Sequence, residues 1–550
     1  MCAVVVLSAC SPGDPSTDAH EQAASSATAT DPPAPASSPR KRSPSPDQAG
    51  VARDVMGVEP AWGPRARDLA SARRLVSTMS LSELAGQVIV ARYDGTGAPA
   101  ALVNELHLGG VIVFDENITD TTQIRRSNQA LQRAVRDAGR RWPVFIGVDQ
   151  EGGIVERVKH DATRFPTFMT AGAAAVPELT RKAAAASGAE LTGLGFTVVF
   201  APAADVTSGP DDPTIGSRSA GSRPRAVATQ VNAAVDGYLS SGVLPVLKHF
   251  PGHGSVPADS HVELPAQRKS LAQLMRSDLV PFRSAVTRGV SSVMVAHIDV
   301  RAVDPGVPSS LSQKVVTGLL RDKLGFEGLV VTDALNMAAI VDRFGSARAS
   351  ARSAVLALLA GNDVLLMPPD PRAAHDAIVA AVRSGKLQRG RLERAATRQI
   401  ALLLHQRSAA PSVVSKPGTS GGISQRFSAA GMSLVSGSCQ GRLVGSSVRA
   451  TGSADVVARF NAAASRAGLS TDSGATIALV GYGGSATSAD VVVSLDTPYV
   501  LGTSSAGKAR IALYGDTVGA MRALVDVLVG KAKAPGHLPV KFAGVDRTGC

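Results

Sequence analysis

Histidines and carboxylates that can do acid–base chemistry are concentrated in one short segment of the chain. The segment reads Lys248-His249-Phe250-Pro251-Gly252-His253-Gly254 and continues, after a short gap, with Asp259-Ser260-His261. Asp259 stands two residues before His261, which is near enough to accept a hydrogen bond from one ring nitrogen. Such a bond fixes the tautomer and leaves the other nitrogen to give and take a proton. The spacing therefore predicts His261 as an acid/base group supported by Asp259.

Two other interpretations of these histidines stay open from the residues alone. His249, His253 and His261 have the side chain that most often ligates zinc. Pro251 and two glycines interrupt any helix here, so two ligands on one helical face, as in HExxH, are not expected. The other interpretation is a glycine-rich loop with structural histidines. We predict no metal and no organic cofactor.

Short apolar runs alternate with helical stretches from about residue 65 onward. Eight runs are almost continuously apolar, which is typical of parallel strands buried on both faces. They are Gln87–Arg92, Gly110–Phe114, Pro143–Asp149, Thr197–Pro202, Leu244–His249, Ser292–His297, Gly328–Asp333 and Asp363–Met367. The α/β pattern predicts a TIM (β/α)8 barrel over residues 65–407, and a doubly wound open sheet is the competing fold.

Helix signals fill the segments between these runs. Ser270 is an N-cap candidate before a helix from Leu271 to Arg288, which Gly289 should end. A helix from Arg348 to Leu359 should end at Gly361 in the same way.

Polar residues stand where four of the predicted strands end. Asp149 ends the third run, Lys248 and His249 the fifth, His297 the sixth and Asp333 the seventh. Any one of them alone is more often a turn or a helix cap. In a barrel, however, the carboxyl ends of the strands form the face that carries catalysis. The pattern therefore predicts an active site there.

The remaining segments predict a multidomain, exported protein. Residues 408–424 have linker composition, and three strands (Ile477–Val480, Val491–Ser494, Arg510–Tyr514) and a helix (Val518–Val529) predict a second, smaller α/β domain over 425–550.

Leu7-Ser8-Ala9-Cys10 resembles a bacterial lipobox, so residues 1–10 are interpreted as a signal remnant and Cys10 as the lipidated residue. Residues 11–64 predict a disordered tether. Export permits a disulfide, and Cys439 and Cys550 are the candidate pair, with two free thiols as the alternative.

The composition of the chain limits the classes of partner that it is expected to bind. The formal charge is +12, but the basic residues are spread along the chain, and only Arg40-Lys41-Arg42 forms a run. We therefore predict no nucleic-acid partner. Aromatic residues make up only 4% of the chain, so a long groove lined with aromatic rings, of the kind that binds polysaccharides, is not expected.

Three motifs resemble glycoside hydrolase family 3, in its β-N-acetylglucosaminidase branch. They are KHFPGHG with the following DSH, VDQEGG upstream and VTDALNM downstream. The resemblance covers about residues 70 to 405 and implies a TIM barrel. The segments Tyr514–Thr517 and Gly536–Val540 also resemble the αβα sandwich domain that many members carry.

The resemblance implies a role for each matching position. Asp333 matches the nucleophile, His261 the acid/base group and Asp259 its partner. Five further positions match residues that hold the sugar, and they are Asp149, Arg157, Arg218, Lys248 and His249. Ala220 stands where the family often has an aromatic residue, which makes Arg218 the less certain match. His297 matches a recurring Ala-His at the sixth strand.

The implied activity is that of a retaining, exo-acting β-N-acetylhexosaminidase. Glucosidase-type members usually take a glutamate acid/base from the second domain, and this chain has no glutamate after Glu393. The expected substrate is a cell-wall glycan ending in N-acetylglucosamine, with water or phosphate as the acceptor. We expect a monomer at the outer face of the cell membrane, or a secreted protein. A family 3 β-glucosidase or β-xylosidase and an inactive envelope-binding lipoprotein are the alternatives.

Overall fold

The computed structural model describes residues 62–409 and 415–545. Cys10 and most of the predicted tether lie outside these residues. Cys439 is disulfide-bonded, while its predicted partner Cys550 lies outside the described residues. Within the described ranges, no helix combines the length and the apolar character needed to cross a membrane.

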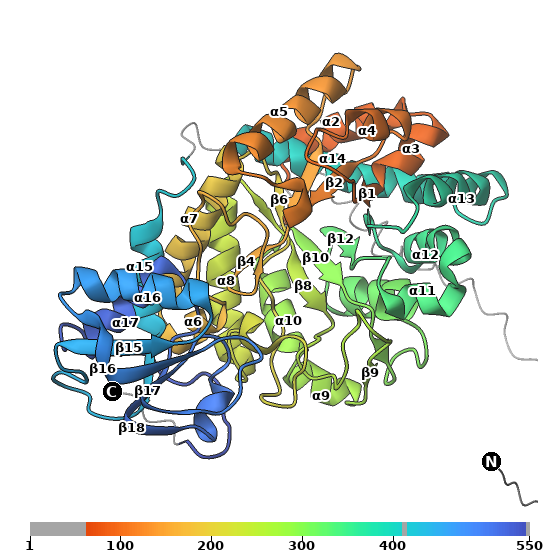
Figure 1. Cartoon of the computed structure of the whole chain (residues 1–550). Coiled ribbons are helices and arrows are strands. Elements are labelled where there is room, and N and C mark those ends of the chain that lie inside the picture. Colours follow the sequence, from red (N-terminus) through yellow and green to blue (C-terminus); the bar gives the residue numbers. More distant parts are fainter. Residues whose placement is uncertain (1–61, 410–414, 546–550) are drawn as a thin grey trace, which may run out of the picture. The chain divides into compact units, whose positions relative to one another are not determined.

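Parallel strands form a closed barrel in the described part of the chain (Figure 1). They are β1 (Ile89–Ala91), β2 (Gly110–Val113), β3 (Phe145–Val148), β6 (Val198–Val199), β7 (Leu244–Pro245) with its continuation β8 (Leu247–Phe250), β10 (Ser292–Val295), β12 (Leu329–Thr332) and β13 (Leu365–Leu366). Six are hydrogen-bonded in the order β13-β1-β2-β3-β6-β7, and three in the order β12-β10-β8. A parallel bridge between Val331 and Val364 joins β12 to the segment that leads into β13. The prediction of a TIM-type α/β fold is confirmed, and the doubly wound sheet was the wrong alternative.

Helices connect the consecutive strands. Their bounds are α2 (Ala66–Ser77), α3 (Leu81–Gln87), α4 (Ala100–Glu105), α5 (Thr121–Asp137), α6 (Met169–Ala174), α7 (Pro177–Gly193), α8 (Pro224–Ser240), α9 (Leu271–Arg276), α10 (Leu279–Thr287), the π-helix η4 (Lys314–Lys323), α11 (Ala338–Phe344), α12 (Ser346–Ala360), α13 (Pro371–Arg383) and α14 (Arg389–Ala409). Ser270 caps α9 by accepting a hydrogen bond from the Gln273 amide. Gly361 ends α12 in the left-handed conformation, which glycine adopts without steric cost.

The predicted helix from Leu271 to Arg288 is broken, which corrects the sequence interpretation. Two helices, α9 and α10, replace it, and Ser277 between them leaves the helical conformation. The carboxylate of Asp278 is fully buried and accepts hydrogen bonds from Ser255 Oγ at 2.5 Å and Lys269 Nζ at 2.7 Å. A buried carboxylate needs such partners, and the helical periodicity of the segment does not predict them.

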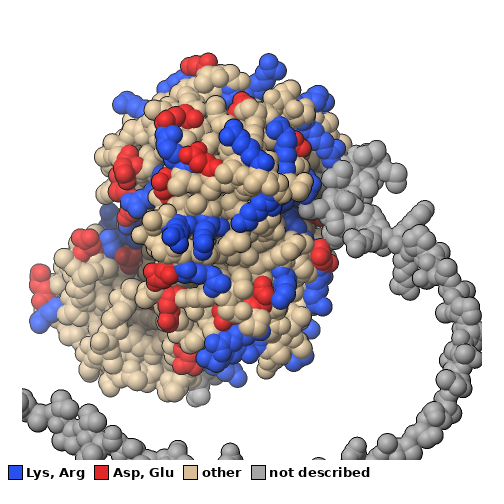
Figure 2. Space-filling view, turned by 90° about the vertical axis from the view of Figure 1, so that its right-hand side faces the viewer, with Lys and Arg blue, Asp and Glu red and all other residues tan. Residues whose placement is uncertain are grey.

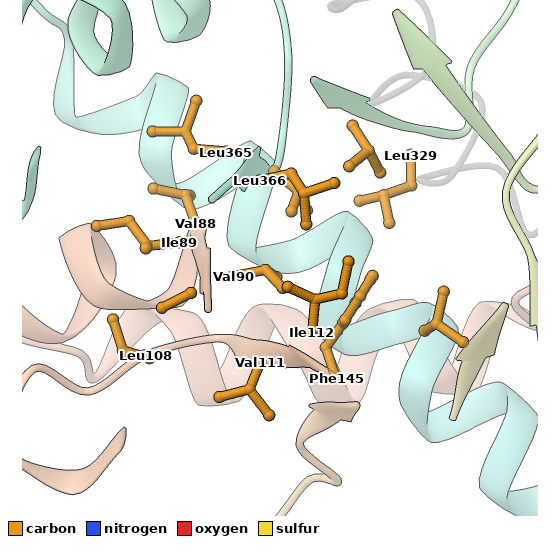
Figure 3. Close-up of a cluster of buried hydrophobic side chains, with 14 of the residues drawn as sticks. Val88, Ile89, Val90, Leu108, Val111, Ile112, Phe145, Leu329, Leu365 and Leu366 are labelled. Atoms are coloured by element: carbon orange, nitrogen blue, oxygen red, sulfur yellow. The ribbon is translucent and has the colours of Figure 1, made fainter. Parts of the chain in front are cut away.

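The barrel core explains why the strands read as unbroken apolar runs. Val90, Ile112, Phe145, Leu329 and Leu366 belong to one cluster of buried side chains (Figure 3). Neighbouring residues of a strand point to opposite faces, and here both faces are covered. Each strand therefore lacks the polar alternation of a half-exposed sheet.

A second sheet follows the barrel and confirms the further domain in the predicted fold class. Its order is β14-β18-β17-β16-β15. The strands are β14 (Ser433–Ser436), β15 (Ser447–Thr451), β16 (Ser470–Val480), β17 (Ser488–Ser494) and β18 (Ser505–Ala512), and the helices are α15 (Gly421–Gly431), α16 (Ala454–Arg466) and α17 (Val518–Leu528). The segment 408–424, predicted as a linker, overlaps the end of α14 and the beginning of α15.

Alternate residues of the second sheet face different layers. Ile477 and Val491 pack in one cluster with residues of α16 and α17. Ala478 and Val492, which follow them, pack in another cluster with Met169 of α6. The second face of this sheet is therefore covered partly by a helix from the barrel half of the chain.

Two further contacts join the second sheet domain to one turn of the barrel. This turn, residues 216–222, is called the Arg218 turn below and begins with the 3-10 helix η2 (Gly216–Arg218). The Ser217 hydroxyl donates to Asp496, which follows β17 and is 8% exposed. The Ser222 amide donates to the Pro539 carbonyl at 3.1 Å. The second domain thus holds the turn at both ends.

Figure 2 shows one face of the molecule, on which acidic side chains lie among the basic ones. This face carries mixed charge, which is typical of a solvated surface.

Candidate functional site

The polar residues predicted at strand ends lie at the carboxyl ends of the barrel strands. Asp149 follows β3, Lys248 and His249 lie in β8, His297 follows β10 by two residues, and Asp333 follows β12. Because all barrel strands are parallel, these ends lie on one side of the barrel.

A buried network of charges joins three of the predicted binding residues through Glu151 of β4 (Gln150–Gly152). Lys248 Nζ lies 2.5 Å from Asp149 Oδ1 and 2.8 Å from Glu151 Oε1. Arg218 donates two hydrogen bonds to Glu151, at 3.0 Å from Nε and 2.8 Å from Nη2. Sequence reasoning missed Glu151, although it stands inside the VDQEGG motif beside Asp149. It is the carboxylate that holds both cations in place.

Burial and charge set the protonation of this network. Burial opposes ionisation of Glu151, but Arg218 and Lys248 outweigh that effect and hold its pKa far below the ordinary value. Burial likewise opposes the charge on Lys248, yet Asp149 and Glu151 raise its pKa. The network therefore keeps its charges at neutral pH and presents fixed hydrogen-bonding groups to a ligand.

Glu151→Gln should destabilise the protein by about 3 kcal/mol, because Arg218 and Lys248 would keep buried charges without their shared partner. Chemical denaturation would measure the loss. Glu178→Gln is the matched control, since Glu178 is an exposed partner of Arg181 and Lys182, and exposed pairs contribute little. Equal unfolding midpoints for Glu151→Gln and the wild type would contradict the role given to the network.

Arg157 lies apart from this network. Its guanidinium is 5.1 Å from the centre of the Phe114 ring, and Nη1 is 3.9 Å from Asp115 Oδ1. Its Nε is buried and has no hydrogen-bond partner within the described residues. The structure thus places Arg157 against Phe114 and Asp115, and its predicted binding role stays a prediction.

His249 is held by Asp205, a second residue that sequence reasoning missed. Asp205 is fully buried and accepts a hydrogen bond from His249 Nδ1 at 2.7 Å. Nε2 of His249 lies 3.3 Å from Arg218 Nη2. The sequence holds a weak signal for it, because Asp205 stands three residues after the fourth apolar run, near the same strand ends as the predicted site residues.

Asp333 is a half-buried carboxylate whose charge is stabilised by several imidazoles. Burial would raise its pKa, but His249, His297 and the Ala334 amide outweigh burial and lower the pKa to about 2. Asp333 is therefore ionised at neutral pH. An ionised carboxylate with few competing donors is the state that a nucleophile requires.

His297 supports the segment that carries Asp333. Its Nε2 lies 2.9 Å from the Ala334 carbonyl, and its Nδ1 lies 2.7 Å from Ser310 Oγ. A carbonyl only accepts, so Nε2 carries the proton and Nδ1 of the neutral ring accepts from Ser310. Both ring nitrogens are occupied within the fold, which leaves His297 without a free group for a sugar.

Asp259 and His261 form the hydrogen-bonded pair expected from their spacing. His261 Nδ1 lies 2.7 Å from Asp259 Oδ1, and the His261 amide donates to the same oxygen at 2.9 Å. The His261 side chain is 64% exposed, so its Nε2 is open to solvent. His261 is also the last of the groups that lower the pKa of Asp333, after His249, His297 and the Ala334 amide.

His253 points inward from the same loop. It is 2% exposed, and burial with the neighbouring His249 lowers its pKa to about 4, against Asp205 and Asp333, which act to raise it. Across the described ranges, no three His, Cys, Asp or Glu side chains form a group that could hold a metal ion.

The buried His253 should make stability depend on pH. Between the ordinary pKa of about 6.5 and the lowered value of about 4, the unfolded chain binds a proton that the folded chain does not. The free energy of unfolding should therefore fall by about 3 kcal/mol as the pH drops through this window. Denaturation of the wild type and of His253→Gln at pH 7 and pH 4 would test this. The variant should lose less stability over the window, and an identical loss would show that His253 does not contribute.

Comparisons with known proteins agree with this geometry. Residues 80–402 match the model of the glycosyl hydrolase family 3 N-terminal domain. Beta-hexosaminidase A of Pseudoalteromonas piscicida is 38% identical over 283 residues, which are 48% of this chain and 47% of that protein. The chain thus spans about half the length of that relative. Beta-hexosaminidase LpqI of Mycobacterium tuberculosis (strain ATCC 25618 / H37Rv) is 35% identical over 351 residues, which are 62% of this chain and 87% of LpqI.

Solved structures extend the similarity to the second domain. A family 3 β-N-acetylglucosaminidase from Paenibacillus sp. str. FPU-7 superposes with a TM-score of 0.75 at 29% identity and covers 85% of this chain and 99% of its own. The structure of M. tuberculosis LpqI gives a TM-score of 0.56 at 32% identity over 60% of this chain and 96% of its own. These matches confirm the resemblance drawn from the three motifs, and the chain belongs to glycosyl hydrolase family 3.

Proposed function

We propose that this family 3 enzyme is a retaining, exo-acting β-N-acetylhexosaminidase. Relatives that share its barrel are named beta-hexosaminidases. The observation that carries the mechanism is the half-buried carboxylate of Asp333, which is ionised and stands at the carboxyl end of β12. A nucleophile and an exposed acid/base group on one side of a barrel are what stepwise glycoside cleavage needs.

In the proposed first step, Asp333 attacks the anomeric carbon while His261 protonates the departing oxygen. The glycosidic C–O bond breaks, and a covalent glycosyl–Asp333 ester forms. In the second step His261 takes a proton from water, the oxygen of that water bonds to the anomeric carbon, and Asp333 leaves as a carboxylate. Asp259 accepts the Nδ1 hydrogen bond throughout and stabilises the imidazolium of the resting acid.

The binding residues fit a small polar ligand. The buried network fixes Asp149, Lys248 and Arg218. Asp205 fixes His249, and Arg157 packs on the Phe114 ring. Charged groups held in this way recognise neighbouring hydroxyls of one sugar ring by direction and distance. We propose that these five residues hold the terminal N-acetylglucosamine.

We propose a cell-wall glycan as the natural substrate and the outer face of the cell membrane as the location, with Cys10 as the lipid-bearing residue. The lipobox-like Leu-Ser-Ala-Cys sequence supports this location. Metabolic labelling with a fatty acid, compared between the wild type and Cys10→Ala, would test it. Products formed with and without phosphate would identify the acceptor.

The function is tested by comparing hydrolysis of an aryl N-acetyl-β-glucosaminide with that of an aryl β-glucoside and an aryl β-xyloside. The proposal expects a clear preference for the first. Preference for either of the others would assign a different activity within the family, and no hydrolysis of any substrate would favour an inactive binding protein.

A further inference from the structure

One residue of the loop that carries the acid/base pair is buried, although its neighbours in the loop are not. Between Pro257 and Glu263, only Ser260 is buried, with 1% of its surface exposed. Ser260 stands between Asp259 and His261. Its environment therefore decides where the acid/base pair is held.

Ser260 is bonded to the inward-facing histidine of the same loop. Its Oγ lies 2.9 Å from His253 Nε2, while His253 Nδ1 is buried without a hydrogen-bond partner in the described structure. Leaving a buried lone pair unused costs less than leaving a buried N–H unused. His253 is thus assigned as donor through Nε2 and Ser260 as acceptor.

Asp205 anchors His253 from the other side. One oxygen of the Asp205 carboxylate accepts from the His253 amide at 2.7 Å, and the other accepts from His249 Nδ1 at 2.7 Å. Asp205 is fully buried and follows β6 at the carboxyl ends of the barrel strands. The same carboxylate therefore orients His249, a proposed binding residue, and the segment at His253 where the acid/base loop begins.

We propose that His253 and Ser260 are positioning residues that latch the acid/base pair Asp259–His261 to Asp205. The latch consists of Asp205, His253 and Ser260. It rests on the proposed function, because positioning has a meaning only if His261 transfers protons. Asp259 and His261 hydrogen-bond to each other, and the buried Ser260 ties the residues between them to the barrel.

The latch matters because proton transfer requires the acid within hydrogen-bonding reach of the departing oxygen. A displacement of about 1 Å can lower a rate about 100-fold. A leaving group that departs easily without a proton is insensitive to this displacement, whereas a poor leaving group is not. Loss of the latch should therefore appear as a dependence on the leaving group.

The test compares Ser260→Ala, which removes the acceptor, with Ser260→Thr, which keeps a hydroxyl. For an alkyl N-acetyl-β-glucosaminide we expect Ser260→Ala to lower kcat about 10- to 100-fold, and for an activated aryl substrate less than about 3-fold. Ser260→Thr should keep most of the alkyl activity. His253→Ala should give the same pattern, and the double variant should be no worse than the more damaged single variant.

Hydrogen exchange of residues 257–263 gives a measurement that does not need activity. Ser260→Ala should speed exchange there about 10-fold or more, while Ser260→Thr and the surface control Thr287→Ala should not. Equal loss of rate on both substrates, additive single variants, or unchanged exchange would overturn the latch. Faster loop exchange in an enzyme whose wild type cleaves neither substrate would support the latch as a structural bond and refute the proposed function.

Discussion

Replacing Asp333 by alanine is expected to lower kcat by about 10⁴-fold or more on every substrate, including activated aryl glycosides. The carboxylate forms the covalent bond in the first step, and no other described carboxylate is surrounded by His249, His297 and His261 in this way. Alanine supplies no nucleophile, so the covalent ester cannot form. Steady-state assays with the aryl substrate measure the effect.

Asp236→Ala is a suitable control for Asp333→Ala, because Asp236 lies on the surface and pairs with Arg288. Its activity should match that of the wild type. Both variants should unfold at temperatures near that of the wild type, which would separate lost chemistry from lost folding. An Asp333→Ala enzyme that retained a tenth of the wild-type kcat would remove Asp333 from the role of nucleophile.

His261→Ala should have a large effect that depends on the substrate. A general acid contributes about 10²- to 10⁴-fold, and this full loss is expected for alkyl glycosides, whose oxygen leaves poorly without a proton. Activated aryl glycosides need little protonation, so their first step should be slowed far less. Rates for a series of leaving groups, plotted against the pKa of the released alcohol, should show a steeper slope for His261→Ala than for the wild type.

The substitution Asp259→Asn distinguishes the contribution of Asp259 to catalysis from that of His261. Asparagine keeps the size of the side chain but cannot stabilise an imidazolium, so this variant should show the same pattern with a smaller loss. Because His261 is 64% exposed, neither substitution should affect stability. Equal losses for alkyl and aryl substrates in His261→Ala would refute the acid role.

The sequence predicted the barrel well because each strand is buried on both faces. Uninterrupted apolar runs such as Gly328–Asp333 indicate parallel strands buried on both faces, and their number, eight, favours a barrel over a doubly wound sheet. The break between α9 and α10 was not predicted, because its cause is the partnership of Asp278 with Ser255 and Lys269. Those partners lie 23 and 9 residues away, so the helix propensity of residues 271–288 does not predict them.

The site was predicted in part for a similar reason. Asp149, Lys248, His249 and Asp333 are visible as polar ends of apolar runs, and the Asp259–His261 pair is visible as a spacing. Their roles stay predictions until the substitutions are measured. Glu151 and Asp205 were missed because each acts on side chains that lie far away in the sequence rather than on a neighbour.

The attachment of the Arg218 turn to the second domain has a consequence for how the enzyme responds to heat and to ligand. A sugar that restrains Arg218 also restrains Ser217, and through Asp496 the end of β17. Ligand binding and the melting of the second sheet are then thermodynamically linked. A saturating inhibitor should slow amide exchange in β17 as well as in the barrel, and Asp496→Ala should weaken that inhibitor although it lies in another domain.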